Sequence, residues 1–157
     1  MIGTLHPTIP SMARITIRHE PPSHGWLSLQ LSIDGQDVEI DASDVPNNPI
    51  QELIDTLDRV VNGIESTVWW NLEPDGYFMT FTPLGEDIAL RLEYAQLSDR
   101  NRSRVVVAVR GQRAEILLPF WRFLREFQSH DYVTPHWPSV SYERMFTTKA
   151  AITGTGA

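Results

Sequence analysis

The sequence has 157 residues, of which 41% are hydrophobic, and a formal net charge of −7 at pH 7. This length and composition are typical of a single folded domain, so we expect one domain over residues 1–157, with an ordered core from about 13 to 146 and irregular tails at 1–11 and 147–157. Cysteine does not occur in the chain, which excludes disulfides and thiolate metal sites. No segment has the apolar length of a signal peptide or a membrane span, and the expected localisation is cytoplasmic.

The charge is distributed unevenly along the chain. The segment from Asp34 to Asp75 holds eleven acidic residues and one basic residue, Arg59, whereas the segment from Arg91 to Arg125 holds eight arginines and three acidic residues. Such asymmetry bears on partners and association rates rather than on fold. It predicts an acidic surface that binds a basic protein, or a homodimer in which the acidic and basic parts pair. The low isoelectric point argues against general nucleic-acid binding.

Alternating apolar residues predict three strands at the start of the chain. The first runs from Arg14 to Arg18, and the second and third are "WLSLQLSI" and "QDVEID". Asp34-Gly35 between the second and third predicts a two-residue hairpin turn. This turn sets the register so that apolar residues face each other in the pairs Leu31 with Val38 and Leu29 with Ile40.

The next segment, "SDVPNNPIQELIDTLDRVVNGI", has apolar residues at helical spacing. Asn48 is a favourable N-cap, Pro49 suits the first helical position, and Gly63 ends the helix. The face of this helix that points away from the core carries mostly acidic residues: Glu52, Asp55, Asp58 and the single base Arg59.

Four strand-like runs follow the helix: "TVWWNLE", "GYFMTFT", "DIALRLEY" and "RVVVAVR". "RAEILL" predicts a further short strand, and Phe120 to Gln128 predicts a second helix that begins after Pro119. Since no connection between the four runs is long enough for a crossover helix, consecutive strands should pair antiparallel. The order βββαββββ(β)α predicts an α+β fold, a two-layer sandwich of one meander sheet of about seven strands with two amphipathic helices on one face.

Adjacent Trp69 and Trp70 cannot both face the core of a strand. A turn at "EPDG" pairs Trp70 with Met79 and puts Trp70 in the core, together with Leu31, Leu57, Leu90 and Val107. Trp69 then lies diagonal to Phe78 on the opposite face. Two interpretations stay open for this pair: an exposed anchor for a partner, or a surface covered by the aromatic C-terminal tail.

Two loose histidine clusters are candidates for metal chemistry. Pro21 and Pro22 interrupt the first cluster and prevent helical alignment of its ligands, and the second cluster is flanked by prolines too. The candidate ligands are His19, Glu20 and His24 in the first cluster, and His130 and His136 in the second. The sequence has no signature of an α/β-hydrolase, a P-loop or a dinucleotide-binding site. The arginines that could touch phosphate are Arg100, Arg102 and Arg104.

The stretches "IDASDVPNNPIQELIDTLDRVVNG" and "VWWNLEPDGYFMTF" resemble small bacterial α+β proteins, some of which are similar to the immunity proteins of toxin systems. The likeness covers about Ile15 to Gln128 and implies a small cytoplasmic protein that binds a cognate toxin. It implies no catalytic residue, metal or cofactor. We therefore predict a non-catalytic protein-binding module with a basic protein partner, and keep a small metal-dependent enzyme as the alternative. The predicted partner-binding residues are Asp41, Asp44, Glu52, Asp55, Asp58, Trp69 and Phe78.

Overall fold

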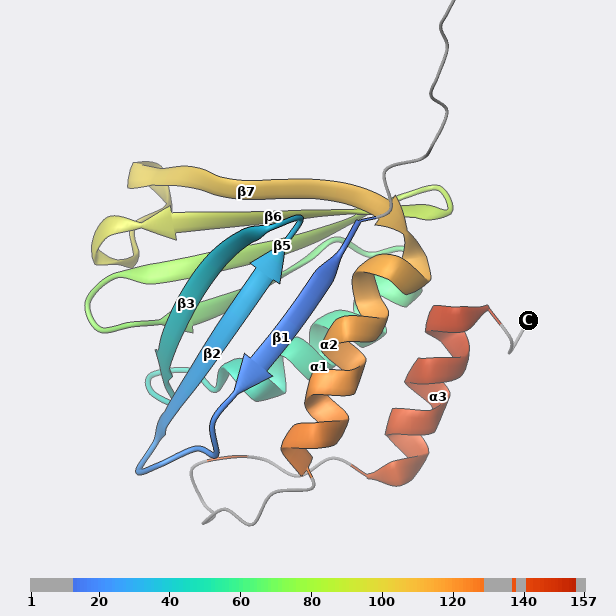
Figure 1. Cartoon of the computed structure of the whole chain (residues 1–157), viewed down its shortest axis with the longest axis horizontal. Coiled ribbons are helices and arrows are strands. Elements are labelled where there is room, and N and C mark those ends of the chain that lie inside the picture. The colour runs from blue at the N-terminus through green and yellow to red at the C-terminus, as the bar shows by residue number, and fades with distance from the viewer. Residues whose placement is uncertain (1–12, 129–136, 138–140, 155–157) are drawn as a thin grey trace, which may run out of the picture.

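The computed structural model describes residues 13–128, 137 and 141–154 (Figure 1). Seven strands and three α-helices occur in this part of the chain. They follow one another as β1 (Ile15–His19), β2 (Trp26–Ile33), β3 (Gln36–Ser43), α1 (Pro49–Val61), β4 (Ser66–Asn71), β5 (Gly76–Leu84), β6 (Asp87–Ala95), β7 (Ser103–Gln112), α2 (Arg113–Gln128) and α3 (Tyr142–Thr153). The predicted α+β class is confirmed.

The strands form two antiparallel sheets and not the single meander that we expected from the sequence. Sheet A has the order β1-β2-β3, and sheet B has the order β4-β5-β6-β7. Strand β3 contacts β4, but side chains occupy the edge of β4 where a strand would pair. The Trp69 N–H donates to Glu52 Oε1 at 2.9 Å, and Asn47 Nδ2 donates to the Trp69 carbonyl at 2.8 Å. The β4 edge is therefore closed by residues at the beginning of α1.

The register of sheet A is the predicted one. Leu31 faces Val38 and Leu29 faces Ile40, and Gly35 adopts the positive φ of +85° that this hairpin turn requires. All four apolar side chains are buried.

The register between β4 and β5 differs from the prediction by two residues. Trp70 faces Tyr77 rather than Met79, and Trp69 lies directly opposite Phe78. The reason is the position of the turn: the Leu72 N–H donates to the Asp75 carbonyl at 2.8 Å, which continues the pairing and leaves Glu73 and Pro74 as the turn residues. A shift of two preserves the side-chain faces, and Trp70 is still fully buried.

Helix α1 begins as predicted. The Asn48 side chain accepts hydrogen bonds from the backbone N–H groups of Ile50 and Gln51, both at 3.1 Å, and Pro49 opens the helix.

Helix α2 is longer than predicted, and the prediction of a short strand at "RAEILL" is wrong. The helix begins at Arg113 and passes through Pro119. Glu115 Oε1 accepts the Gln112 N–H at 2.8 Å, which satisfies a donor at the helix start. The buried residues then recur at helical spacing through Ile116, Leu117, Phe120, Trp121, Phe123, Leu124 and Phe127.

Helix α3 corrects the prediction of an irregular tail from residue 147. Ser141 Oγ accepts the Arg144 N–H at 3.2 Å, and Gly154 ends the helix with a φ of 74°. Met145, Thr148 and Ile152 are buried at helical spacing. Residues 1–11 and 155–157 of the predicted tails lie outside the described residues.

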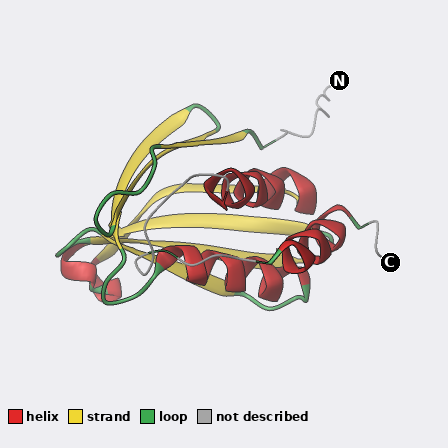
Figure 2. Cartoon of the chain, turned by 90° about the horizontal axis from the view of Figure 1, so that it is seen from below, coloured by secondary structure: helices red, strands yellow, loops and turns green. Residues whose placement is uncertain are grey.

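The layers share one hydrophobic core. Sheet A, α1 and α2 cover one face of sheet B, while α3 packs on the outer side of α1 and α2 (Figure 2). The core contains every residue predicted for it from the sequence: Leu31, Leu57, Trp70, Leu90 and Val107. Among the described helices, none combines the length and the apolar character needed to cross a bilayer.

Candidate protein-binding surface

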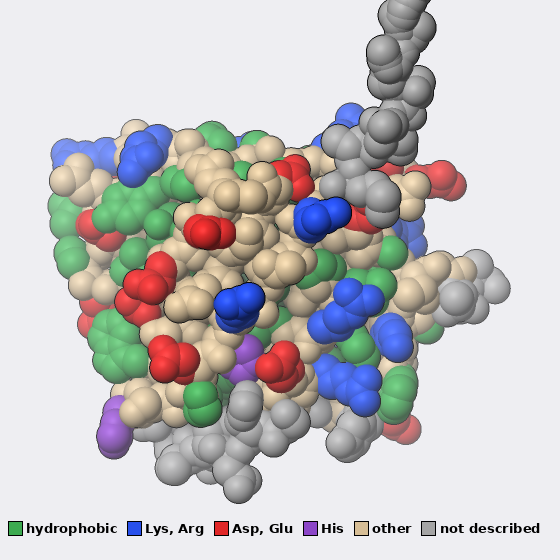
Figure 3. Space-filling model, viewed as in Figure 1, with side chains coloured by type: hydrophobic (Ala, Val, Ile, Leu, Met, Phe, Trp, Pro, Cys, Tyr) green, Lys and Arg blue, Asp and Glu red, His purple; other side chains and the backbone are tan. Residues whose placement is uncertain are grey.

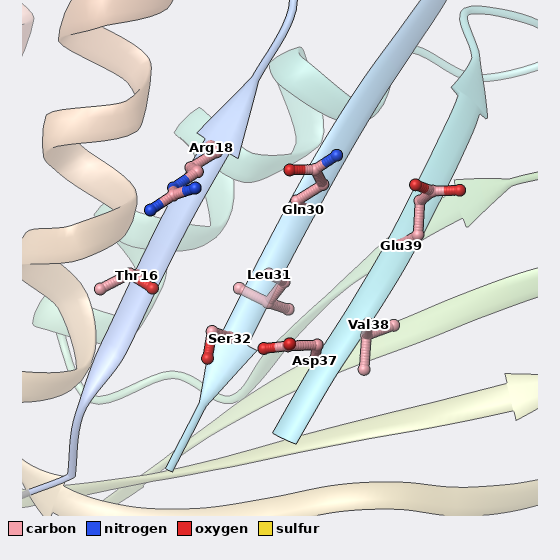
Figure 4. Close-up of a pocket in the computed structure, with 8 residues that line it drawn as sticks. All are labelled: Thr16, Arg18, Gln30, Leu31, Ser32, Asp37, Val38 and Glu39. Atoms are coloured by element: carbon pink, nitrogen blue, oxygen red, sulfur yellow. The ribbon is translucent and has the colours of Figure 1, made fainter. Parts of the chain in front are cut away.

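The outer face of sheet A carries polar side chains from all three strands in cross-strand rows. One row is Arg18, Gln30 and Glu39, and the next is Thr16, Ser32 and Asp37 (Figure 4). These six residues line a shallow hollow together with the edges of Leu31 and Val38. We call this surface the sheet A face. It comprises Thr16, Arg18, Trp26, Ser28, Gln30, Ser32, Asp37, Glu39 and Asp41.

The sheet A face is acidic and ends in an exposed tryptophan. Asp37, Glu39 and Asp41 are all exposed along β3, and Arg18 is the one basic residue that the three strands place on this face. Acidic side chains gather over β2 and β3 in Figure 3, whereas basic side chains gather over α2. At the beginning of β2, Trp26 is 44% exposed. Large aromatic side chains dominate the binding energy of protein interfaces, and carboxylates steer a basic partner toward them.

Of the predicted acidic residues, Asp41 lies on this face and Asp44 lies just beyond its end. The Ser28 hydroxyl donates to Asp41 Oδ1 at 2.5 Å. The Asp44 N–H donates to the Gly25 carbonyl at 2.9 Å, which holds the chain beside the start of β2. Both residues therefore follow the same edge of β2, one opposite Ser28 and the other opposite Gly25.

Glu52 is separate from them and binds the backbone. Besides the Trp69 N–H, it accepts Asn47 Nδ2 at 2.6 Å, and its side chain is partly buried. These contacts stabilise the edge of β4.

Asp55 and Asp58 contact α3 and are partly buried by it. The Arg144 guanidinium donates to Asp55 at 2.8 Å and to Asp58 at 2.7 Å, and the Thr148 hydroxyl donates to Asp58 at 2.6 Å. The pKa of Arg144 is raised: burial lowers it, but the hydrogen bonds that Arg144 donates to both carboxylates outweigh that effect. Part of the acidic face predicted for α1 is therefore a contact with α3, a helix that we did not predict.

We expect the Arg144–Asp58 pair to contribute about 0.5–1 kcal/mol to stability, because both side chains remain about one-third exposed. Arg144→Ala, Asp58→Ala and the double variant form a mutant cycle that urea unfolding can measure. Arg59→Ala is the control, since this arginine is exposed on the same helix as Asp58. A coupling of zero would show that the ion pair adds nothing.

Trp69 and Phe78 stack in parallel, with ring centroids 6.2 Å apart. The connection between β6 and β7 covers them: Ser98 Oγ accepts the Trp69 indole N–H at 3.2 Å, and the Arg100 guanidinium lies 4.9 Å from the centre of the Phe78 ring. Phe78 is only 9% exposed. Trp69 is partly exposed, and the cover that the structure describes for this pair comes from residues 98–100.

The aromatic residues of the C-terminal part lie elsewhere where the structure describes them. Trp137 is buried against Phe127, with ring centroids 6.0 Å apart, and Phe146 is exposed on α3. Tyr132 lies outside the described residues, and so does the side chain of Tyr142.

Two carboxylates, Asp75 and Glu93, accept hydrogen bonds at the end of sheet B where the β4–β5 turn meets the connection between β6 and β7. The Tyr94 hydroxyl and the Leu97 N–H both donate to Asp75, and these hydrogen bonds lower the pKa of Asp75. Burial raises the pKa of Glu93, but hydrogen bonds from Ser103 and Arg91 outweigh it and the net shift is downward. Both carboxylates are therefore ionised near neutral pH.

The first histidine cluster does not converge on one site. The His19 side chain is 1% exposed and packs edge-on against Phe123 at 5.0 Å, whereas Glu20 and His24 are exposed. Within residues 13–128, 137 and 141–154, no three residues of the ligand types lie close enough to hold a metal ion. His130 and His136 lie outside the described residues.

The three arginines considered for phosphate contacts each have a partner within the chain. Arg100 also lies 3.7 Å from Glu93, Arg102 lies 3.7 Å from Asp99, and Arg104 lies 5.5 Å from the centre of the Tyr94 ring.

Sequence reasoning missed Trp26, Asp37 and Glu39 as site residues. The strand pattern does indicate them, because residues two apart in a strand point to the same face. Trp26 therefore shares a face of β2 with Ser28 and Gln30. Asp37 and Glu39 share a face of β3 with Asp41.

No protein-family model matches the chain, and no curated protein is similar to it. Among solved structures, it is similar to a chain described as "CdiA-CT/CdiI toxin and immunity complex from Enterobacter cloacae". The similarity has a TM-score of 0.43 and 12% sequence identity, and it covers 73% of this chain and 99% of that chain.

Proposed function

We propose that the chain is a non-catalytic protein-binding module of the immunity type that binds a basic protein partner through its sheet A face. The observation that carries this proposal is the exposed Trp26 at one end of a strand that lies beside Asp37, Glu39 and Asp41. The aromatic side chain supplies contact area, and the three carboxylates supply charge complementarity to cationic side chains.

The proposal narrows the predicted site. Asp41 and Asp44 stay in it, and Trp26, Asp37 and Glu39 join it. Glu52, Asp55 and Asp58 leave it because they are only partly exposed and bind the edge of β4 or α3. Asp41 also accepts a hydrogen bond, from Ser28, but it stays exposed on the sheet A face.

Replacing Asp37, Glu39 and Asp41 together by Lys should slow association with the partner by at least about tenfold at low salt. Charge acts mainly on the association rate and is screened over about 8–10 Å at physiological salt, so the residual binding should depend less on salt. The measurement is capture of partners from a lysate of the source cell, followed by association rates of the captured protein at several salt concentrations.

The matched control reverses three exposed acidic residues outside the face, Glu65, Glu86 and Glu143, and so makes the same change in net charge. Both triple variants should fold like the parent, because exposed substitutions usually change stability by about 0.5 kcal/mol or less each. Equal binding by the two variants would refute the sheet A face as the site.

A further inference from the structure

A second surface lies where the β4–β5 turn meets the connection between β6 and β7. Trp69, Asn71, Glu73 and Pro74 line a shallow hollow there together with Leu97 and Ser98. We call it the Leu97 hollow. Leu97 is 59% exposed.

The backbone at this point adopts an unusual conformation. Leu97 and Ser98 have φ values of 56° and 54°, in the left-handed region, and neither is glycine. Non-glycine residues rarely adopt this region, and they persist there only when the surrounding structure imposes it.

Three side-chain hydrogen bonds impose the conformation. The Leu97 N–H donates to Asp75 Oδ1 at 2.9 Å, the Ser98 hydroxyl donates to the Pro74 carbonyl at 3.0 Å, and the Trp69 indole N–H donates to Ser98 Oγ. The result is a leucine whose backbone is held in place and whose side chain is exposed in the hollow that Trp69 also lines. A backbone that is ordered before binding loses little entropy on contact.

The hollow adjoins the end of the sheet A face. Asn71 Nδ2 donates to the Val45 carbonyl at 2.8 Å, and Val45, two residues beyond β3, is 55% exposed. The Glu73 side chain is exposed on the rim. An occupant must therefore combine an apolar side chain for Leu97 and Trp69 with a positive charge for Glu73.

We propose that the Leu97 hollow binds an aliphatic side chain of the basic protein partner that lies next to an arginine or lysine. This inference rests on the proposed protein-binding function, and it names a second contact that is independent of the carboxylates of β3.

The probe is the capped dipeptide acetyl-Leu-Arg-amide, added to ¹⁵N-labelled protein and followed by NMR. We expect saturable shifts of the Trp69 indole N–H, the Asn71 side-chain amide and the backbone amides of Leu97 and Ser98. Acetyl-Ser-Arg-amide has the same charge, and its association should be weaker by about tenfold, the effect of losing one buried aliphatic side chain.

Leu97→Gly is the matched variant, because glycine adopts a φ near +56° without strain and only the side chain is lost. It should fold at least as stably as the parent and lose the shifts. Shifts that do not saturate, equal shifts with both peptides, or unchanged binding by Leu97→Gly would each overturn the proposal.

The triple Lys variant of Asp37, Glu39 and Asp41 separates the two proposals. It should bind the dipeptide like the parent, since those residues do not line the Leu97 hollow. If the dipeptide fails to bind while partner capture still depends on these carboxylates, the hollow is refuted and the proposed function is retained.

Discussion

Replacing Trp70 by Ala is expected to lower the free energy of unfolding by about 3–5 kcal/mol, the usual cost of removing a large buried aromatic side chain. Trp70 has no exposed surface and belongs to the core that joins both sheets to α1 and α2. The surrounding strands and helices cannot collapse fully into the space, because sheet register and helix packing fix their backbones. Urea unfolding followed by circular dichroism measures the change.

Trp26→Ala is the matched control, since it removes the same side chain from a position that is 44% exposed. We expect it to cost less than about 1 kcal/mol because much of its surface is in contact with water in the folded state. Comparable losses in the two variants would contradict the burial of Trp70 and the assignment of faces in β4. Trp26→Ala should also weaken partner binding, which Trp70→Ala would reduce only through loss of folded protein.

Local patterns in the sequence predicted the parts of the fold that depend on local chemistry. The Asp34-Gly35 turn fixed the pairing of Leu29 with Ile40, and the Asn48 cap with Pro49 fixed the start of α1. These features are encoded within a few residues of one another. The faces of β4 were predicted correctly for the same reason, since side-chain parity survives a register shift of two.

The predictions of the fold that were wrong concern features that depend on contacts between distant segments of the chain. The division into two sheets comes from Asn47 and Glu52, which bind the edge of β4 from the start of α1. Nothing in the strand patterns indicates that these side chains replace a neighbouring strand. Likewise, "RAEILL" is rich in helix-forming residues, but Pro119 directly after it indicated a boundary. The structure has one helix that runs through Pro119 and buries its apolar residues in the shared core.

The candidate site shows the same limit. The predicted acidic patch required the acidic residues on α1 to be free for a partner. Arg144, which is far along the chain, binds two of them, Asp55 and Asp58. The acidic residues of β3 were equally visible in the sequence, but their exposure depends on the outer face of sheet A staying open. Charge counts located the acidic segment, and only the tertiary structure separated its structural carboxylates from its exposed ones.

Gly76→Ala is expected to destabilise the protein by about 1–3 kcal/mol, although it adds only one methyl group. A Cβ at Gly76 would lie 2.6 Å from Ser98 Oγ and 2.7 Å from Trp69 Nε1, closer than real Cβ contacts allow. The methyl group would force apart the hydrogen bond between Trp69 and Ser98 and move the connection that covers the Trp69–Phe78 stack. Urea unfolding measures the cost, and the NMR signal of the Trp69 indole N–H reports the broken bond.

Ser98→Ala distinguishes the clash from the loss of the hydrogen bond. Ser98→Ala alone should lower the free energy of unfolding by about 1 kcal/mol, the typical contribution of one hydrogen bond. Trp69 should stay stacked on Phe78 in this variant. In the Ser98→Ala background, Gly76→Ala should cost less than it does in the parent, because one of the two clashing atoms is gone. An undiminished cost there would place the clash on Trp69 alone, and a Gly76→Ala protein as stable as the parent would contradict the close packing of the β4–β5 turn against Ser98.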